Sequence, residues 1–322
     1  MAVLSGCVSA LAIVTWFSAE NDSTAFFTPA QSHTDEPLSD TLTHTVLQKT
    51  VTVFDRRGRI SYGVYTAAAR LFDAALLSAD GWSVAALPAT LPAAGDLIAV
   101  TQSGSEHRVQ NMLRDTVSGL VYLRLDGSEF KIVEFADRPS SELQPLFAVG
   151  AGGATRITLA RAVSDRSVPD SAPLIASFVR PSVRLEEASG QTLIVDATGA
   201  LAGVVGRDST FIDSRYVEAV LSSVLKNGKI SYQSLSAEVR PLYGRLSADD
   251  GGAFRYGLLV VRVRAGSGPL FPGDTILSIA GVPVDLSFLP FAIFEAPDPV
   301  PLTVLRAGER LDILVPKQQV SL

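Results

Sequence analysis

The stretch Leu185–Gly206 reads LEEASGQTLIVDATGALAGVVG, and the interpretation of the whole chain begins from it. A Ser-Gly pair, Ser189 and Gly190, lies in a short irregular segment. An apolar run at 193–195, the turn signal Asp-Ala-Thr-Gly and a second apolar run at 201–205 follow. Two β-rich runs joined by a short Asp- and Gly-containing loop predict a β-hairpin. We therefore expect a serine on a loop that leads into a buried hairpin.

The chain has the composition of a globular protein, with 322 residues, 47% of them hydrophobic and 19% charged. This length allows about two domains. A net charge of −6 without any long Lys/Arg run argues against nucleic acid as a partner. The single cysteine, Cys7, excludes an internal disulfide and a cysteine-based metal site. His33, His44 and His107 do not have metal-ligand spacing, so we expect neither a metal nor another cofactor.

The N-terminal region is interpreted as a membrane anchor followed by a linker. Residues 2–17 are apolar or small throughout, although this run is slightly short for a span of about 20 residues and lacks preceding basic residues. We assign residues 1–18 to an anchor, and a cleaved signal sequence is the alternative. Residues 19–47 are rich in Ser, Thr, Asp and Pro, which predicts a flexible linker. A single-pass membrane protein with extracytoplasmic domains is the resulting expectation.

From residue 48 onward, short β-rich runs alternate with turn signals, a pattern typical of a sandwich or barrel. One helix is predicted in the first part, at 214–226, from apolar residues at helical spacing, and Asn227-Gly228 provides its stop. Residues 232–318 contain further strands and turns and form a second module. The clearest early runs are 51–54, 74–77, 96–101, 120–125 and 146–149.

Several stretches, taken in order, resemble the HtrA family, in which a trypsin-like double β-barrel is followed by a PDZ domain. Residues 78–90 are similar to the strand and turn that lead to the family's catalytic histidine, and 114–127 are similar to the segment that carries the catalytic aspartate. Residues 188–206 resemble the serine motif and its hairpin. The segments 257–263, 271–284 and 301–315 resemble three PDZ segments.

This resemblance implies a mostly β fold, with the double β-barrel over 48–231 and the PDZ domain over 232–318. It also implies which residues stand at the catalytic positions. Pro88 stands at the histidine position and Gly119 at the aspartate position, whereas Ser189 remains where the nucleophile is expected. A serine hydroxyl is a poor nucleophile unless an imidazole accepts its proton and a carboxylate orients that imidazole. We therefore expect a pseudoprotease in which Ser189 is vestigial.

The turn around the serine is altered as well. In the family, a glycine-rich turn presents backbone N–H groups to the developing oxyanion. Here Glu187 and Gln191 stand at glycine positions, and Thr192 stands at a proline position. A glutamate restricts the backbone there and places a negative charge near the place where negative charge must accumulate.

An active serine endopeptidase that uses Ser189 with a non-standard base is the alternative. The histidines offer little support for it, because His33 and His44 fall in the linker. His107 falls on a strand that precedes Gly119, and in the order of the family's motifs this strand is far from the histidine position.

The second module is the better functional candidate, because PDZ domains bind extended peptide ends by adding a strand to a sheet edge. By resemblance, 255–258 forms the carboxylate-binding loop and 258–264 forms the edge strand. The helix expected near 286–294 is interrupted by Pro290, and the loop after Gly266 is short. A PDZ fold that is kept only for packing is therefore an alternative of equal weight. The candidate peptide-binding residues are Tyr256, Gly257, Leu258, Leu259 and Val261.

Together these inferences predict a membrane-anchored, proteolytically inactive HtrA-like protein of the cell envelope. Its expected partners are polypeptides or protein C-termini bound through the PDZ domain. The resemblance also implies assembly through the barrel, as a homotrimer or with active relatives. A purely structural envelope component is the remaining alternative.

Overall fold

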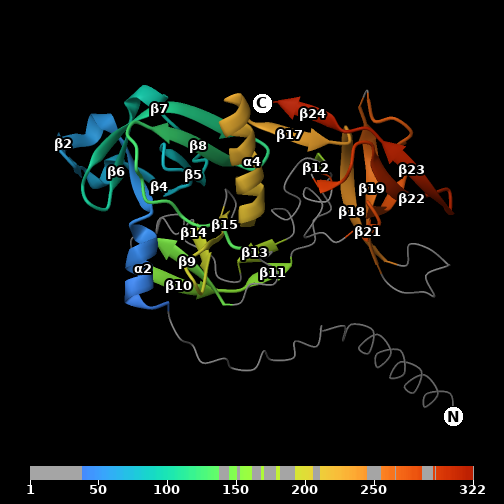
Figure 1. Ribbon diagram of the computed structural model, residues 1–322, viewed down its shortest axis with the longest axis horizontal. Helices are drawn as coiled ribbons and strands as arrows, with labels where there is room; N and C mark the ends of the chain where they lie inside the picture. The colour runs from blue at the N-terminus through green and yellow to red at the C-terminus, as the bar shows by residue number, and fades with distance from the viewer. Residues whose placement is uncertain are drawn as a thin grey trace, which may run out of the picture. The chain divides into compact units, whose positions relative to one another are not determined.

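The computed structural model of the chain describes residues 38–137, 145–150, 153–161, 168–169, 179–181, 193–205, 211–244, 255–264, 266–284, 293 and 295–321 (Figure 1). The predicted anchor over 1–18 lies outside this part of the chain, and so does Ser189. Within the described ranges, no helix is both long and apolar enough to cross a membrane.

Six antiparallel strands close into a barrel in the order β1-β4-β5-β8-β7-β6. Strand β8 is apolar except at the exposed Arg124, because both faces of its remaining residues are buried. Val121 and Leu123 belong to the core of the barrel, and Leu120 and Tyr122 belong to the core outside it. The sequence predicts this strand with the same bounds. The strands are β1 (Thr50–Asp55), β4 (Arg70–Leu76), β5 (Trp82–Ala86), β6 (Leu97–Thr101), β7 (Glu106–Asp115) and β8 (Leu120–Leu125).

A second antiparallel sheet has the order β10-β9-β14-β15-β16. The predicted hairpin forms its centre and is confirmed, because β14 pairs with β15. Asp196 stabilises the turn between them, since its Oδ1 accepts hydrogen bonds from the backbone N–H groups of Thr198 and Ala200 at 2.8 and 3.0 Å. The strands are β9 (Leu146–Gly150), β10 (Gly153–Ile157), β14 (Leu193–Asp196), β15 (Leu201–Val205) and β16 (Phe211–Asp213), while β11 (Leu159–Arg161) pairs separately with β13 (Val179–Pro181).

The predicted helix after the second sheet is confirmed as α4 (Ser214–Asn227). Its N-cap residue, Asp213, accepts a hydrogen bond from Arg215 N at 3.0 Å, which satisfies a backbone donor of the first turn. At the other end, Gly228 has a φ of 68° and donates its N–H to the carbonyl of Val224 at 2.8 Å. This left-handed conformation favours glycine, as the sequence signal indicated.

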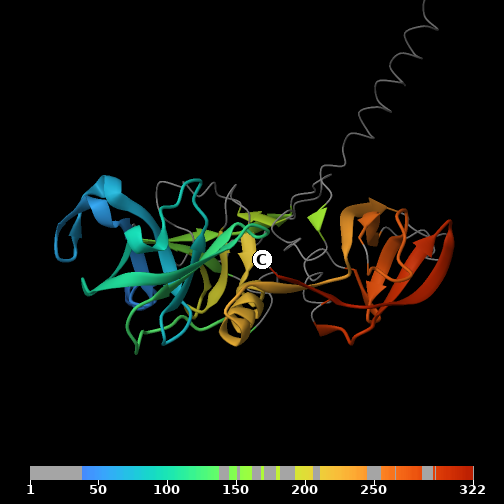
Figure 2. The same ribbon diagram turned by 90° about the horizontal axis from the view of Figure 1, so that it is seen from above.

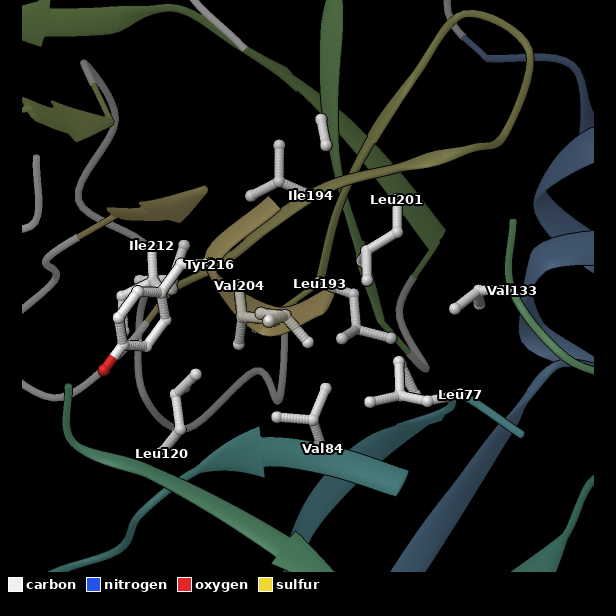
Figure 3. Packing of buried hydrophobic residues seen from close by; sticks show 14 of the residues in the cluster. Leu77, Val84, Leu120, Val133, Leu193, Ile194, Leu201, Val204, Ile212 and Tyr216 are labelled. Atoms are coloured by element: carbon white, nitrogen blue, oxygen red, sulfur yellow. The ribbon is translucent and has the colours of Figure 1, made fainter. Parts of the chain in front are cut away.

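The barrel, the second sheet and α4 share one hydrophobic core. Figure 3 shows Val84 and Leu120 from the barrel facing Leu193 and Val204 of the hairpin, with Tyr216 of α4 beside them. Each of these side chains is at most 4% exposed. This packing fixes the two sheets and the helix relative to one another.

The sequence predicts a flexible linker over 19–47, but residues Asp40–Leu47 form helix α2. The Ser39 hydroxyl accepts a hydrogen bond from Leu42 N at 3.3 Å and so caps the helix. Leu42 and Val46 lie one turn apart on the buried face, and Val46 is 1% exposed. This apolar face outweighs the polar composition that suggested a linker. The helix packs against Phe147, Val149 and Val195.

The C-terminal strands form a separate seven-stranded sheet in the order β12-β18-β19-β20-β22-β23, with β21 paired to β20. Figure 2 shows its main strands, coloured orange to red, gathered together. The sheet has its own hydrophobic core, which includes Leu258, Val260, Ile276 and Val304. The strands are β12 (Val168–Pro169), β18 (Ala237–Gly244), β19 (Arg255–Val263), β20 (Thr275–Ile279), β21 (Val282–Pro283), β22 (Val300–Arg306) and β23 (Glu309–Val315).

Two smaller strand pairs complete the described part. Strand β24 (Gln318–Ser321) returns to pair with β17 (Ser231–Ser234), the strand that follows α4. A short hairpin of β2 (Arg59–Ser61) and β3 (Val64–Tyr65) extends from the barrel between β1 and β4. The remaining elements are the 3-10 helices η1 (Arg56–Gly58), η2 (Ala67–Ala69) and η3 (Ala94–Asp96).

Candidate functional site

Two loops at one end of the barrel carry the positions that the resemblance assigns to the catalytic histidine and aspartate. Pro88 lies two residues after β5, and Gly119 ends the turn between β7 and β8. The backbone N–H of Leu87 donates to the carbonyl of Gly119 at 2.8 Å, next to the paired residues Ala86 and Leu120. The fold therefore brings these two positions together, although they are 31 residues apart in the sequence.

Neither of these residues can take part in proton transfer. Pro88 has a saturated ring, and Gly119 has no side chain. Gly119 has a φ of 72°, a left-handed conformation that glycine adopts without a steric penalty. The hydrogen-bonded imidazole and carboxylate of a serine protease cannot be built from these two residues.

A buried carboxylate holds the turn that carries Gly119. Asp115 is fully buried, and its Oδ1 accepts hydrogen bonds from the backbone N–H groups of Val117 and Ser118 at 3.0 Å each. Its Oδ2 accepts hydrogen bonds from the Ser118 hydroxyl and, at 3.0 Å, from the Tyr216 hydroxyl of α4. With four donors around it, Asp115 is saturated, so it fixes the turn in place and links it to α4.

A buried tyrosine lies beside this network. Burial raises the pKa of Tyr122 well above its ordinary value, and the negative charge of Asp115 raises it further. Its hydroxyl has no hydrogen-bond partner among the residues that the structure describes. Tyr122 therefore stays protonated at neutral pH and does not replace the missing base.

The predicted peptide-binding residues belong to β19, and the edge position predicted for this strand is wrong. Strand β19 pairs with β18 along most of its length, and on its other side Leu258 and Leu259 pair with β20. Leu258 is fully buried in the core of the sheet, and Gly257 is buried as well. Leu259 is half-buried, Val261 is 43% exposed, and the side chain of Tyr256 lies outside the described part. A peptide strand cannot add to β19 at Leu258 and Leu259, because the backbone there is already paired on both sides.

The open edge belongs instead to β18, the strand before β19. Among the described strands, β18 pairs on its outer side with β12 alone, through Val239 and Glu238. Residues 240–244 pair with β19 alone among the described strands. Sequence reasoning missed this edge because local alternation marks a strand without showing how many neighbours it has. The helix expected near 286–294 lies almost wholly outside the described residues.

Comparison with solved structures shows what this arrangement resembles. A structure described as the HtrA-type protease AlgW with a decapeptide matches with a TM-score of 0.54 and 17% identity, over 88% of this chain and 99% of that chain. AlgW with a tripeptide matches with a TM-score of 0.54 and 18% identity, over 88% and 97%. The chain has the fold of an HtrA-type protease. No family model matches the sequence, and no curated protein matches it.

Within this HtrA-type fold, the described histidines lie away from Pro88 and Gly119. His107 is near the start of β7, where its Nδ1 donates to the carbonyl of Asp126 at 2.8 Å. His44 belongs to α2. The residues Ser189, Glu187, Gln191 and Thr192 of the serine motif, together with His33, lie outside the described part of the chain. Over the described residues, no group of three or more His, Cys, Asp or Glu side chains could hold a metal ion.

Proposed function

We propose that this chain is a proteolytically inactive protein of HtrA-type fold that binds extended polypeptides. The observation that supports this proposal best is the contact between the end of β5 and the turn between β7 and β8. The contact is the hydrogen bond from Leu87 N to the carbonyl of Gly119. Pro88, the residue after Leu87, and Gly119 are the residues that the resemblance places at the histidine and aspartate positions. Loss of triad members in a serine protease lowers the rate by about 10⁴- to 10⁶-fold.

The position of His107 also supports this proposal. Gly119 lies before β8 and Asp126 lies after it, so the strand separates them. Six residues at about 3.3 Å each span roughly 20 Å, and the His107 ring is bonded at the Asp126 end. An imidazole that serves as a general base must lie within about 3 Å of the hydroxyl it activates. An active endopeptidase that uses Ser189 with a non-standard base remains the alternative to be tested.

The polypeptide is proposed to bind at the open edge of β18, over residues 240–244. Backbone N–H and C=O groups at such an edge hold an added strand, as in PDZ domains, and Pro241 contributes a carbonyl but no N–H. The AlgW structures with a decapeptide and a tripeptide are consistent with peptide binding on this fold. This assignment moves the proposed contact from the interior strand β19 to its neighbour, and it treats residues 232–318 as a PDZ domain.

The proposal includes the location and the assembly of the protein. Residues 1–18 anchor it in the cell membrane as a single-pass protein, with the folded domains on the extracytoplasmic side. The barrel assembles with further copies, as a trimer, or with active relatives. Its bound polypeptides are then held at the membrane surface without being cut.

Cleavage of casein by the full chain tests the inactivity. We expect no fragments at concentrations at which an active HtrA-type protease digests casein completely. The Ser189→Ala variant is the matched control, and we expect it to behave as the unchanged chain does. Cleavage that this variant abolishes would establish the active endopeptidase instead.

Amide hydrogen exchange tests the binding edge. Decapeptides with free C-termini are first selected from a display library on the full chain, and the selected peptide is then added. We expect slower exchange within residues 240 and 242–244, since Pro241 has no amide hydrogen, and no change in β23, which is the other edge of the sheet and serves as the internal control. Protection confined to β23, or no enriched peptide at all, would refute binding at β18, and the latter result would favour a structural component.

A further inference from the structure

A second candidate site lies at the end of the barrel remote from Pro88 and Gly119. It is a hollow of about 480 Å³, which is within the range of small-molecule sites. Three segments that are far apart in the sequence form it: the end of α2, the turn between β6 and β7, and the stretch after β8. Nothing in the function proposed above uses this hollow.

A lysine and a histidine are linked across one side of the hollow. Lys131 Nζ donates to Gln48 Oε1 at 2.9 Å, and Gln48 Nε2 lies 3.0 Å from His44 Nε2. Because the amide oxygen accepts from Lys131, the amide nitrogen is the donor toward His44, and His44 Nε2 is the acceptor. A lysine ammonium has three N–H donors, and this bond uses one of them.

A second histidine lines the hollow from β7. His107 Nδ1 donates to the carbonyl oxygen of Asp126 at 2.8 Å, because a carbonyl can only accept. The ring packs edge-to-face against Phe130, with 4.7 Å between the ring centroids. The ring is therefore held in place, with Nε2 as its remaining polar atom.

Hydroxyl groups complete the polar lining. Thr101 Oγ1 and Ser103 Oγ lie 2.8 Å apart, and Ser103 Oγ lies 3.3 Å from Ser105 Oγ. These hydroxyl groups belong to the turn between β6 and β7, whereas Lys131 belongs to the stretch after β8. Hydrogen-bond donors therefore line the hollow on two different elements. Glu129 is the single carboxylate residue in the lining, and its charge opposes an anion. The ring of Phe130 and the side chain of Leu76 supply an apolar wall.

We propose that this hollow binds a small phosphate ester. Lys131 and the serine hydroxyls bind the phosphate oxygens, and Phe130 contacts the organic part of the ligand. Phosphate suits this lining because it offers several strong acceptor oxygens to donors that arrive from different directions. The volume exceeds what one phosphate group fills, which favours an ester over inorganic phosphate.

The first test uses sulfate, a tetrahedral dianion whose charge does not change between pH 5.5 and 8. Imidazole resonances of the full chain are followed by NMR while sulfate replaces chloride at constant ionic strength. We expect saturable shifts at His107 and His44, assigned with single His→Gln variants. Linear shifts without saturation, or shifts at neither histidine, would overturn the site.

Two exposed residues that line the hollow have opposite charges, so removing each charge should change the sulfate affinity in opposite directions. Lys131→Gln removes the cation, and we expect it to weaken sulfate binding at least about tenfold. Glu129→Gln removes the opposing charge, and we expect it to tighten binding. Lys226→Gln, an exposed change in the last turn of α4, is the matched control and leaves the affinity unchanged. Equal effects of Lys131→Gln and Lys226→Gln on sulfate affinity would contradict a specific site, because they would show that only the net charge of the protein attracts the anion.

Phenyl phosphate and inorganic phosphate distinguish the ester from the bare anion. The phenyl group reaches the apolar wall at Phe130, so we expect phenyl phosphate to bind several-fold more tightly at the same pH. Equal affinities would show that the hollow takes the anion alone and would refute the ester.

Discussion

At the residue scale, the proposed inactivity depends on Pro88 and Gly119, which the resemblance places at the histidine and aspartate positions. The backbone contact between the carbonyl of Gly119 and the N–H of Leu87 is present, so the loops are in place. Neither residue has a side chain that could accept a proton or orient an imidazole. That these two positions correspond to the catalytic histidine and aspartate stays a prediction from the resemblance. The position of Ser189 relative to them stays a prediction, since it lies outside the described residues.

A residue in the C-terminal sheet gives a prediction about pH. Asp274 is 1% exposed, and Arg306 binds both of its oxygens, at 2.7 and 2.8 Å. Burial raises the pKa of Asp274, but the hydrogen bonds from Arg306 and from Phe271 N lower it by more, so the pKa lies below its ordinary value. The stabilisation by this ion pair is therefore present above about pH 4 and is lost as the pH falls through the lowered pKa.

We expect Asp274→Asn to lower the free energy of unfolding by about 2 kcal/mol at pH 7, as for a lost hydrogen bond between charged groups. The difference from the unchanged chain shrinks below pH 4, because Asp274 of the unfolded chain then binds a proton while the lowered pKa keeps the folded carboxylate ionised, and it is lost once the folded carboxylate is protonated too. Urea unfolding at pH 7 and at pH 3 measures both values. Asp137→Asn, an exposed change, serves as the control. A difference that grows on acidification would contradict the ion-pair explanation.

At the scale of elements, the hairpin β14–β15 and helix α2 depend on each other. Gly199, in the hairpin turn, has a φ of 83°. A Cβ added there would lie 2.9 Å from Leu42 Cδ1 and 3.1 Å from Val46 Cγ2, both of which belong to α2. The turn needs glycine for its backbone conformation and also to leave room for the helix.

We expect Gly199→Ala to destabilise the protein by about 1–2 kcal/mol, the penalty for a left-handed conformation with a side chain. The displaced helix adds to this penalty. Gly95→Ala is the matched control, because its Cβ would have no atom within 4 Å and its φ is not positive. Chemical denaturation of the two variants measures the difference, and equal stabilities would contradict the packing of α2 on this turn.

Most elements were predictable from short apolar runs and turn signals, and some were not. Strands β8, β15 and β20 have the bounds that the sequence suggested, because their residues are buried and their turns carry Gly or Asp. Helix α2 was missed because only one narrow face of eight residues is apolar. The interior position of β19 was missed because pairing with β20 depends on the register of distant strands. A family resemblance supplied the order of the stretches, which composition alone could not.

At the scale of the whole molecule, the last strand pairs with the segment that connects α4 to the C-terminal sheet. Strand β24 pairs with β17 from Ser231↔Ser321 to Ser234↔Gln318. Side chains reinforce this pair, since Gln319 Nε2 donates to Ser231 Oγ at 3.2 Å and Ser231 Oγ lies 2.6 Å from Ser223 Oγ of α4. The segment between α4 and the C-terminal sheet therefore depends on residues that lie almost 90 positions later.

We expect a chain that ends at Lys317 to lose amide protection over β17. Exchange at β22 should stay unchanged, because β20 and β23 pair with this strand on its two sides. Hydrogen exchange read by mass spectrometry measures both strands in the same sample. Unchanged protection of β17 in the shortened chain would show that β24 does not hold this connection.

The most direct test of inactivity is labelling of the full chain with a fluorophosphonate, which reacts only with an activated serine. The residues at the two triad positions supply no base, so we predict no labelling of the unchanged chain and the same result for Ser189→Ala. An active HtrA-type protease in the same experiment shows that the probe is competent. Labelling of the unchanged chain that Ser189→Ala abolishes would contradict the account.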